Sequence, residues 1–122
     1  MAQVSKRKLS ASTNGRQIKI SATTSGGAQA IHVATASVNV GTFDEVWLYA
    51  TNTDAADRIL NVCLGGTTNP DDLIFVTIPA GSVGRYLVLD GVILQGGATL
   101  SAYATSFPNV INVSGFVNAI TA

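Results

Sequence analysis

Short apolar runs alternate with polar clusters along most of this chain, and most runs are followed closely by Gly, Asn, Asp or Pro. From residue 43 onward the apolar runs lie at 46–50, 59–64, 73–78, 85–89, 92–94, 99–104 and 110–117. Two weaker alternating segments precede them, at 17–21 and 28–40. Alternation with nearly even breaks is typical of strands. It predicts an all-β fold: a single antiparallel β-sandwich, jelly-roll-like, with about eight strands.

The stretch 43–64 is the centre of this pattern and contains the only Trp and the only Cys. In its first half the even-numbered positions 46–50 are apolar, and Trp47 and Tyr49 between them are aromatic. A strand with two apolar faces is expected to be covered on both sides. The polar residues 52–57 predict a turn, so the stretch is interpreted as a hairpin. We therefore expect one face to pack inside the domain and the other against a second subunit.

Two details of the pattern are less regular. In the segment 28–40, we expect Ile31, Val33, Val38 and Val40 to point inward. Further along, Asp90-Gly91 separates two apolar runs and predicts a tight turn or a bulge.

Composition supports the all-β assignment. Hydrophobic residues make up 47% of the chain and charged residues only 11%, whereas soluble domains usually carry about 25% charged residues. Only one Glu is present and the helix formers Lys, Gln and Met are scarce, while Thr, Val, Asn, Ser and Gly are abundant. The low charge has two explanations that the sequence leaves open: neighbouring subunits cover much of the surface, or the surface is a simple Thr/Ser/Asn-rich β-surface.

The net charge of zero conceals a strong asymmetry. Five cations lie within the first nineteen residues, which contain no acid: Lys6, Arg7, Lys8, Arg16 and Lys19. The rest of the chain has two cations and seven acids. This predicts a basic extended N-terminal arm over residues 1–27 and an acidic β-sandwich domain over residues 28–122. We expect the five cations to bind an acidic protein surface. Nucleic acid is the less favoured partner, because aromatic residues are not interleaved with the cations in the sequence.

Candidate chemistry is sparse. One His and one Cys do not provide a zinc site, and the sequence has no Gly-x-Ser-x-Gly element around which His32 could act. Cys63 lies in an apolar run and is expected to be a buried structural thiol. Asp54, Asp57 and the segment 69–72 could offer oxygen ligands to calcium, but they lack the spacing of a calcium loop and are interpreted as turn residues. We expect no enzymatic activity, no metal and no cofactor.

Five aromatic residues lie within predicted strands: Trp47, Tyr49, Phe75, Tyr86 and Tyr103. Core or subunit packing is the commoner role of such residues, and stacking on a sugar is the alternative. The basic start of the chain lacks the apolar segment of a secretory signal, and no apolar run approaches the roughly 18 residues of a membrane span. We expect neither export nor membrane insertion.

The runs DEVWLYATNT at 44–53 and DRILNV at 57–62 resemble small β-sandwich structural proteins of tailed bacteriophage virions. The resemblance continues through 73–79, 85–94 and 109–115, and the first forty residues have no part in it. It lies in Thr-, Asn- and Gly-rich strands with few charges, so it assigns no individual site residue.

The resemblance implies a component of the virion, most simply a capsid decoration (cement) protein. Such a protein would form a homotrimer and clamp neighbouring subunits of the major capsid protein, with the basic arm reaching the capsid lattice. Head fibre, tail and head–tail connection roles are alternatives, as is a carbohydrate- or receptor-binding module of the virion.

Overall fold

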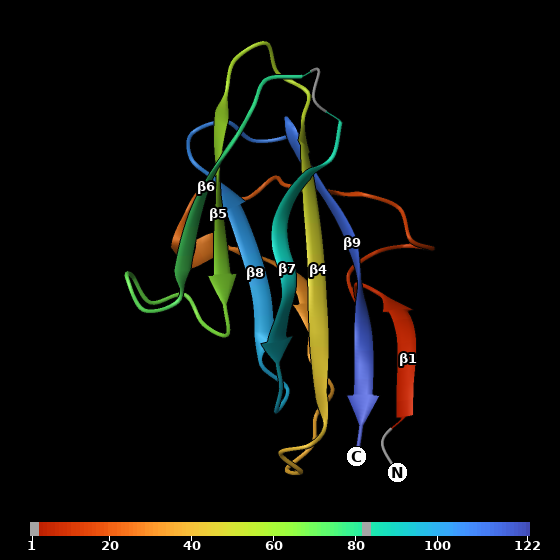
Figure 1. Cartoon of the computed structure of the whole chain (residues 1–122). Helices are drawn as coiled ribbons and strands as arrows, with labels where there is room; N and C mark the ends of the chain where they lie inside the picture. The colour runs from red at the N-terminus through yellow and green to blue at the C-terminus, as the bar shows by residue number, and fades with distance from the viewer. Residues whose placement is uncertain (1–2, 82–83) are drawn as a thin grey trace.

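The computed structural model describes residues 3–81 and 84–122, and in them two antiparallel sheets pack face to face (Figure 1). The strands are β1 (Gln3–Lys8), β2 (Ile18–Lys19), β3 (Gln29–Val33), β4 (Phe43–Asn52), β5 (Arg58–Leu64), β6 (Leu73–Ile78), β7 (Tyr86–Leu94), β8 (Thr99–Ala104) and β9 (Ile111–Thr121). A single 3₁₀ turn (Ser25–Gly27) is the helical element of these residues, and none of them forms a helix able to cross a membrane. The prediction of an all-β sandwich is confirmed.

The chain is folded as one long hairpin that is wrapped into two layers. The nested pairs are β2 with β9, β3 with β8, β4 with β7 and β5 with β6. Successive pairs alternate between a five-stranded sheet, with the order β1-β9-β4-β7 and β2 also on β9, and a four-stranded sheet, with the order β3-β8-β5-β6. This nesting is the topology of a jelly roll. It makes β4 and β9 neighbours in the middle of the five-stranded sheet.

The core lies between the sheets and is made by the alternation of β4 and β9. Every second residue of β4 is buried, as are Ile111, Val113, Val117 and Ala119 of β9, and the residues of the outer face are half-buried. The largest fully buried side chains are Leu9, Ile20, Ile31, Leu48, Leu60, Ile78, Leu100, Ile111, Val46, Val62, Val113 and Val117. Each such side chain contributes about 1.5–3 kcal/mol on burial. The pattern of Val, Ile and Leu at every second position therefore determines which face of each sheet points inward.

The sequence predicts an arm over residues 1–27 and a separate domain over residues 28–122, but the structure does not show this division. β1 and β2 both pair with β9, and Leu9 and Ile20 are buried in the core. The charge asymmetry predicts a basic extended arm, but it does not reveal strand pairing, which uses backbone groups and needs no apolar side chains. The first 27 residues therefore belong to the sandwich, although β1 itself has no buried residue.

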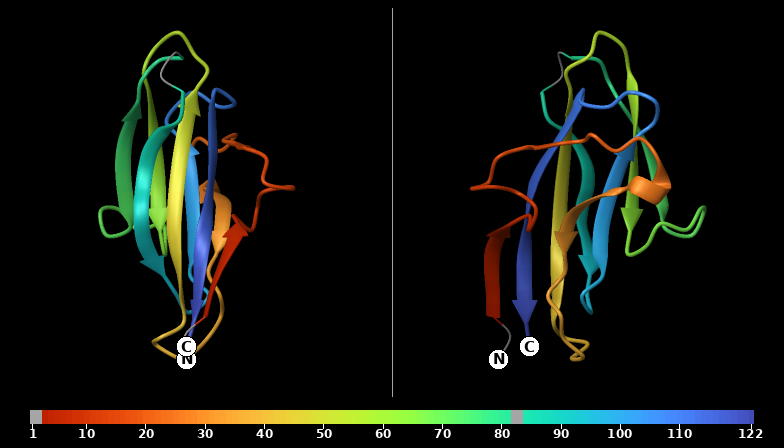
Figure 2. Two further views of the ribbon diagram at one scale, coloured as in Figure 1. Left: turned by 45° about the vertical axis from the view of Figure 1, so that its right-hand side comes forward. Right: turned by 180° about the vertical axis from the view of Figure 1, so that it is seen from behind.

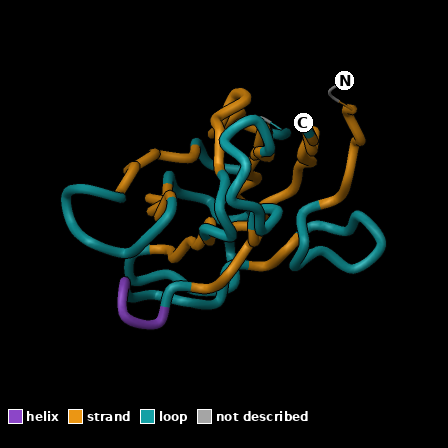
Figure 3. Tube along the Cα trace, turned by 90° about the horizontal axis from the view of Figure 1, so that it is seen from below, coloured by secondary structure: helices purple, strands orange, loops and turns teal. Residues whose placement is uncertain are grey.

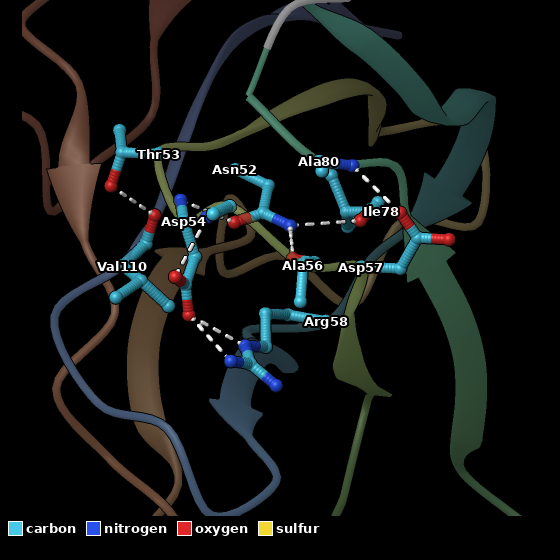
Figure 4. Close-up of polar contacts among 10 residues, drawn as sticks. Asn52, Thr53, Asp54, Ala56, Asp57, Arg58, Ile78, Ala80 and Val110 are labelled. Atoms are coloured by element: carbon cyan, nitrogen blue, oxygen red, sulfur yellow. Dashed lines mark hydrogen bonds and ion pairs between the residues drawn. The ribbon is translucent and has the colours of Figure 1, made fainter.

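The predicted hairpin over 43–64 is wrong, because β4 and β5 lie in different sheets. The connecting residues 53–57 cross from one sheet to the other (Figure 4). The Asn52 side chain donates to the carbonyl oxygens of Ala56 (2.8 Å) and Ile78 (3.0 Å), and Asp54 accepts from Arg58 Nε (2.7 Å). The turn residues were recognised correctly, but periodicity does not distinguish a hairpin turn from a connection between layers.

The predictions for the two irregular segments, 28–40 and Asp90-Gly91, differ in their outcome. The segment 28–40 is a strand only over Gln29–Val33, with a bulge between Ala30 and His32 that turns Val33 outward. Val38 and Val40 lie in the following loop and are exposed, so the expectation that these three point inward is wrong. Of the tight turn and the bulge expected as alternatives at Asp90-Gly91, the structure has the bulge, because the register of β7 against β4 shifts there and Gly91 has φ +86°.

We predict that Gly115→Ala strongly destabilises the fold. A Cβ at Gly115 would overlap the Trp47 carbonyl oxygen of the adjacent strand, and the φ of +154° disfavours alanine. Backbone shifts that admit such an atom cost about 1–3 kcal/mol, and conformational strain adds to this cost. Urea unfolding should therefore show a loss of about 3 kcal/mol or more.

Gly26→Ala is the matched control, because a Cβ there meets no atom within 4 Å and the residue has no positive φ. We expect it to change stability by less than about 1 kcal/mol. Equal stabilities of the two variants would contradict the close approach of β4 and β9 at Gly115.

Candidate interaction surface

The outer face of the five-stranded sheet carries an aromatic surface, which we call the aromatic face. Its residues are Phe43, Trp47 and Tyr49 of β4, Phe116 and Ile120 of β9, and the exposed Val4, Leu87 and Ile93 at its two sides. Trp47 lies directly opposite Phe116, and their rings stack with centroids 6.1 Å apart and planes 10° apart. The surface exists because alternation in β4 and β9 places apolar residues on both sides of the sheet.

The Trp47 indole is positioned by packing against Gly91 and by hydrogen bonding. A Cβ at Gly91 would lie 3.2 Å from Trp47 Cζ2, so the ring packs closely over this glycine. The indole Nε1 donates to Glu45 Oε1 at 2.8 Å, and Asn118 Nδ2 donates to the same oxygen at 3.1 Å. The bond from Trp47, with a smaller effect of Asn118, lowers the pKa of Glu45. Trp47 is therefore held by packing and by a charge-assisted hydrogen bond.

Cations from distant parts of the chain lie over the aromatic rings. Lys6 Nζ is 4.3 Å from the centroid of Phe116, and the Arg85 guanidinium is 4.3 Å from that of Tyr49. At exposed sites such cation–π contacts contribute about 0.5–1 kcal/mol each. The fold therefore interleaves cations and aromatic residues that are separate in the sequence.

The five predicted arm cations are all exposed but do not share one face. Lys6 and Lys8 lie on the aromatic face opposite Asn118 and Phe116, and Lys19 lies there opposite Asn112. Arg7 is opposite the inward-facing Val117, and Arg16 is in the loop between β1 and β2. Three of the five cations thus border the aromatic face.

The five predicted aromatic residues are divided between the two sheets. Trp47 and Tyr49 lie on the aromatic face. Phe75 and Tyr103 lie on the outer face of the other sheet, one on each side of Asn61. Tyr86 is at the start of β7, opposite Ala50 of β4. These residues therefore do not form one platform, and Phe75, which is 63% exposed, belongs to a second surface.

A buried polar network joins the sheets near one end of β4. His32 of β3 and Asp44 of β4 are both buried, with Nε2 and Oδ2 2.6 Å apart. The Ser10 backbone N–H donates to His32 Nδ1 at 3.0 Å. Because Nδ1 accepts, we assign the ring proton to Nε2, which donates to Asp44. Thr35 donates to the same carboxylate through its backbone N–H (3.2 Å) and its hydroxyl (2.9 Å).

A small pocket of about 180 Å³ lies beside the connection between β4 and β5 and is lined by Arg58, Ile59, Thr105 and Phe107 among others. The Arg58 guanidinium lies 3.5 Å from the Phe107 ring centroid and pairs with Asp54 at 2.7 Å. The Asp54 pKa is lowered by its bond to Arg58 and by the Ala55 N–H. Arg58, the cation of this pocket, therefore already pairs with Asp54 and stacks on Phe107.

Residues 3–81 and 84–122 contain no group of three or more His, Cys, Asp or Glu that could hold a metal ion. Cys63 is buried; burial raises the pKa of its thiol, and the charge of Asp72 adds to the effect. A thiol in such surroundings is a weak nucleophile.

Sequence reasoning missed Phe116 of the aromatic face, and it missed Glu45 and Arg85, which contact the Trp47 and Tyr49 rings of that face. The alternation of β9 offered a signal for Phe116, since Asn112, Ser114 and Phe116 alternate with the buried Val113 and Val117 and with Gly115. Arg85 gave no comparable signal, because its contact with Tyr49 depends on how β7 pairs with β4.

We predict that Asp44→Ala costs about 3 kcal/mol of unfolding free energy. The variant leaves the ring N–H of His32 and both donors of Thr35 without their acceptor, and each buried unsatisfied donor costs about 1–3 kcal/mol. Asp57→Ala is the control, since Asp57 is exposed and accepts from the Ala80 N–H; it should cost about 1 kcal/mol or less. Chemical denaturation that finds the two variants equal would contradict a structural role for the His32–Asp44 network.

Comparison of the chain with protein-family models, with curated proteins and with solved structures gives no match. Any functional assignment therefore depends on the residues of this chain itself.

Proposed function

We propose that this chain is a non-enzymatic structural subunit of a tailed-bacteriophage virion, most simply a capsid decoration protein that self-associates through the aromatic face. The observation that carries the proposal is the stacked pair Trp47 and Phe116 on an outer sheet face, flanked by exposed Leu87 and Ile93. An apolar centre with a charged margin is the usual composition of a subunit interface. The low charged fraction of 11% is consistent with a surface that neighbours cover.

A capsid decoration protein also needs a contact with the capsid lattice, and the exposed cations near the start of the chain suit that contact. Lys8, Lys19 and Arg16 are exposed along the β1 and β2 edge of the five-stranded sheet, and Arg7 is exposed on the other side of β1. An acidic patch on a capsid lattice would attract this edge. The homotrimer and the major capsid protein as partner come from the resemblance of the 44–62 region to virion proteins.

A carbohydrate-binding role is the second candidate, and one observation favours it. Trp47 lies beside Glu45 and Asn118, which combines an aromatic ring with polar groups of the kind that bind sugar hydroxyls. Glycan-array binding that Trp47→Ala abolishes, with an unchanged circular dichroism spectrum, would favour this role over self-association.

We predict that wild-type protein associates in light scattering and that Leu87→Lys/Ile93→Lys dissociates it. Both side chains are exposed in the single chain, at 46% and 57%, so the fold should tolerate the changes. Burying a Leu or Ile side chain contributes about 1.5–3 kcal/mol, so losing two weakens association by about a hundredfold or more.

Ile59→Lys/Phe75→Lys adds the same charge on the outer face of the four-stranded sheet, where both side chains are exposed (45% and 63%), and should leave association unchanged. Co-sedimentation with purified phage capsids tests the virion role directly. A wild-type protein that stays monomeric at millimolar concentration and has no affinity for capsids would overturn the proposal.

A further inference from the structure

β1 is an appendage of the sandwich and is not part of its core. All six of its residues, Gln3–Lys8, are exposed, so neither face of the strand is covered. The turned views show β1 at the margin of the molecule, beside β9 and apart from the four-stranded sheet (Figure 2). Its attachment is therefore the backbone ladder to β9, supplemented by Lys6 over Phe116.

The chain becomes anchored to its own body directly after β1. Leu9 is 1% exposed, and the Ser10 backbone N–H donates to His32 Nδ1. In return the Val33 N–H donates to the Ser10 hydroxyl at 2.8 Å, and the Ala11 N–H donates to the Ile31 carbonyl at 3.1 Å. A hinge between Lys8 and Leu9 would consequently release β1 without disturbing the core.

The part of β9 that pairs with β1 is held by other strands and does not depend on β1. The receiving edge is the segment of β9 from Phe116 to Thr121, which β4 and the core hold from the other side. A β1 strand from a second copy would find the same backbone groups and the same Phe116 ring. Exchange between copies therefore keeps every contact, and its equilibrium depends on how close the second copy is.

Charge favours exchange over simple pairing of β1 edges. Two β1 strands laid edge to edge would bring two sets of Lys6, Arg7 and Lys8 together, and like charges on an edge strand oppose such pairing. Residues beyond the first nineteen contain two cations and seven acids. A basic β1 is thus attracted to the acidic body of another copy as it is to its own.

We infer that β1 is an exchangeable strand that pairs with β9 of a second copy, in the register that sets Val4 opposite Ile120 and Lys8 opposite Phe116. The inference rests on the proposed self-association. Val4, Lys6 and Lys8 border the aromatic face, so a copy that packs on this face lies next to the hinge and to the receiving edge.

The test uses cysteine pairs in a Cys63→Ala background, with Val4→Cys in one chain and Ile120→Cys in a differently tagged chain. After co-expression and mild oxidation, exchange gives a disulfide-linked heterodimer on non-reducing gels. A heterodimer yield no higher than that of the control pair Val4→Cys with Phe75→Cys overturns the inference. Phe75 is 63% exposed and lies on the outer face of the four-stranded sheet, away from β9, so this pair measures random collision.

A single chain that carries both Val4→Cys and Ile120→Cys gives the second measurement. Exchange predicts interchain disulfides, whereas a strand that remains on its own body gives intrachain disulfides alone and overturns the inference. Associated protein with only intrachain disulfides would overturn exchange and leave the proposed self-association intact. Monomeric protein would overturn both.

Discussion

The ladder between β4 and β9 is the constraint on which the rest of the structure depends. It pairs every residue of Phe43–Asn52 with a residue of β9. The inner side chains of both strands fill the core, and their outer side chains form the aromatic face. Since β9 also receives β1 and β2, this one ladder connects the ends of the chain to its centre. Interior packing and surface chemistry are consequently set by the same alternation.

The strands were predictable where alternation and breaks coincide. The runs 73–78 and 99–104 have the same bounds as the observed strands β6 and β8. The run 59–64 begins one residue after the observed start of β5 at Arg58. The hairpin over 43–64 and the arm boundary at residue 27 differ from the structure for a common reason: a local pattern does not specify the partner of a strand. Residues 52–57 have turn chemistry in either case, and whether β5 returns beside β4 or joins the opposite sheet is decided by long-range pairing. β1 lacks an apolar face altogether, so only its backbone reveals its place in the sheet.

Only part of the aromatic face and its surroundings was predictable from the sequence. Trp47 and Tyr49 stand out because both faces of their strand are apolar. The cations that lie over the rings come from β1 and from Arg85, directly before β7, and they reach the same surface only because β1 pairs with β9 and β7 pairs with β4. The bond between His32 and Asp44 is likewise invisible in the sequence, because it joins strands of different sheets across the core. Polar contacts between layers require the fold to be known first.

The nested topology also places the two ends of the described chain together. Gln3 lies opposite Thr121 in the ladder, and the start of the first described strand lies near the end of the last one when the molecule is seen from below (Figure 3). The tip of the long hairpin is the loop of residues 65–72, at the other end of the nesting and largely exposed. The molecule is thus suited to circular permutation: a short linker can close the present ends, and new ends can be opened at the tip without removing a strand. In a permuted chain β1 would be tethered on both sides, which converts an exchangeable strand into a fixed one.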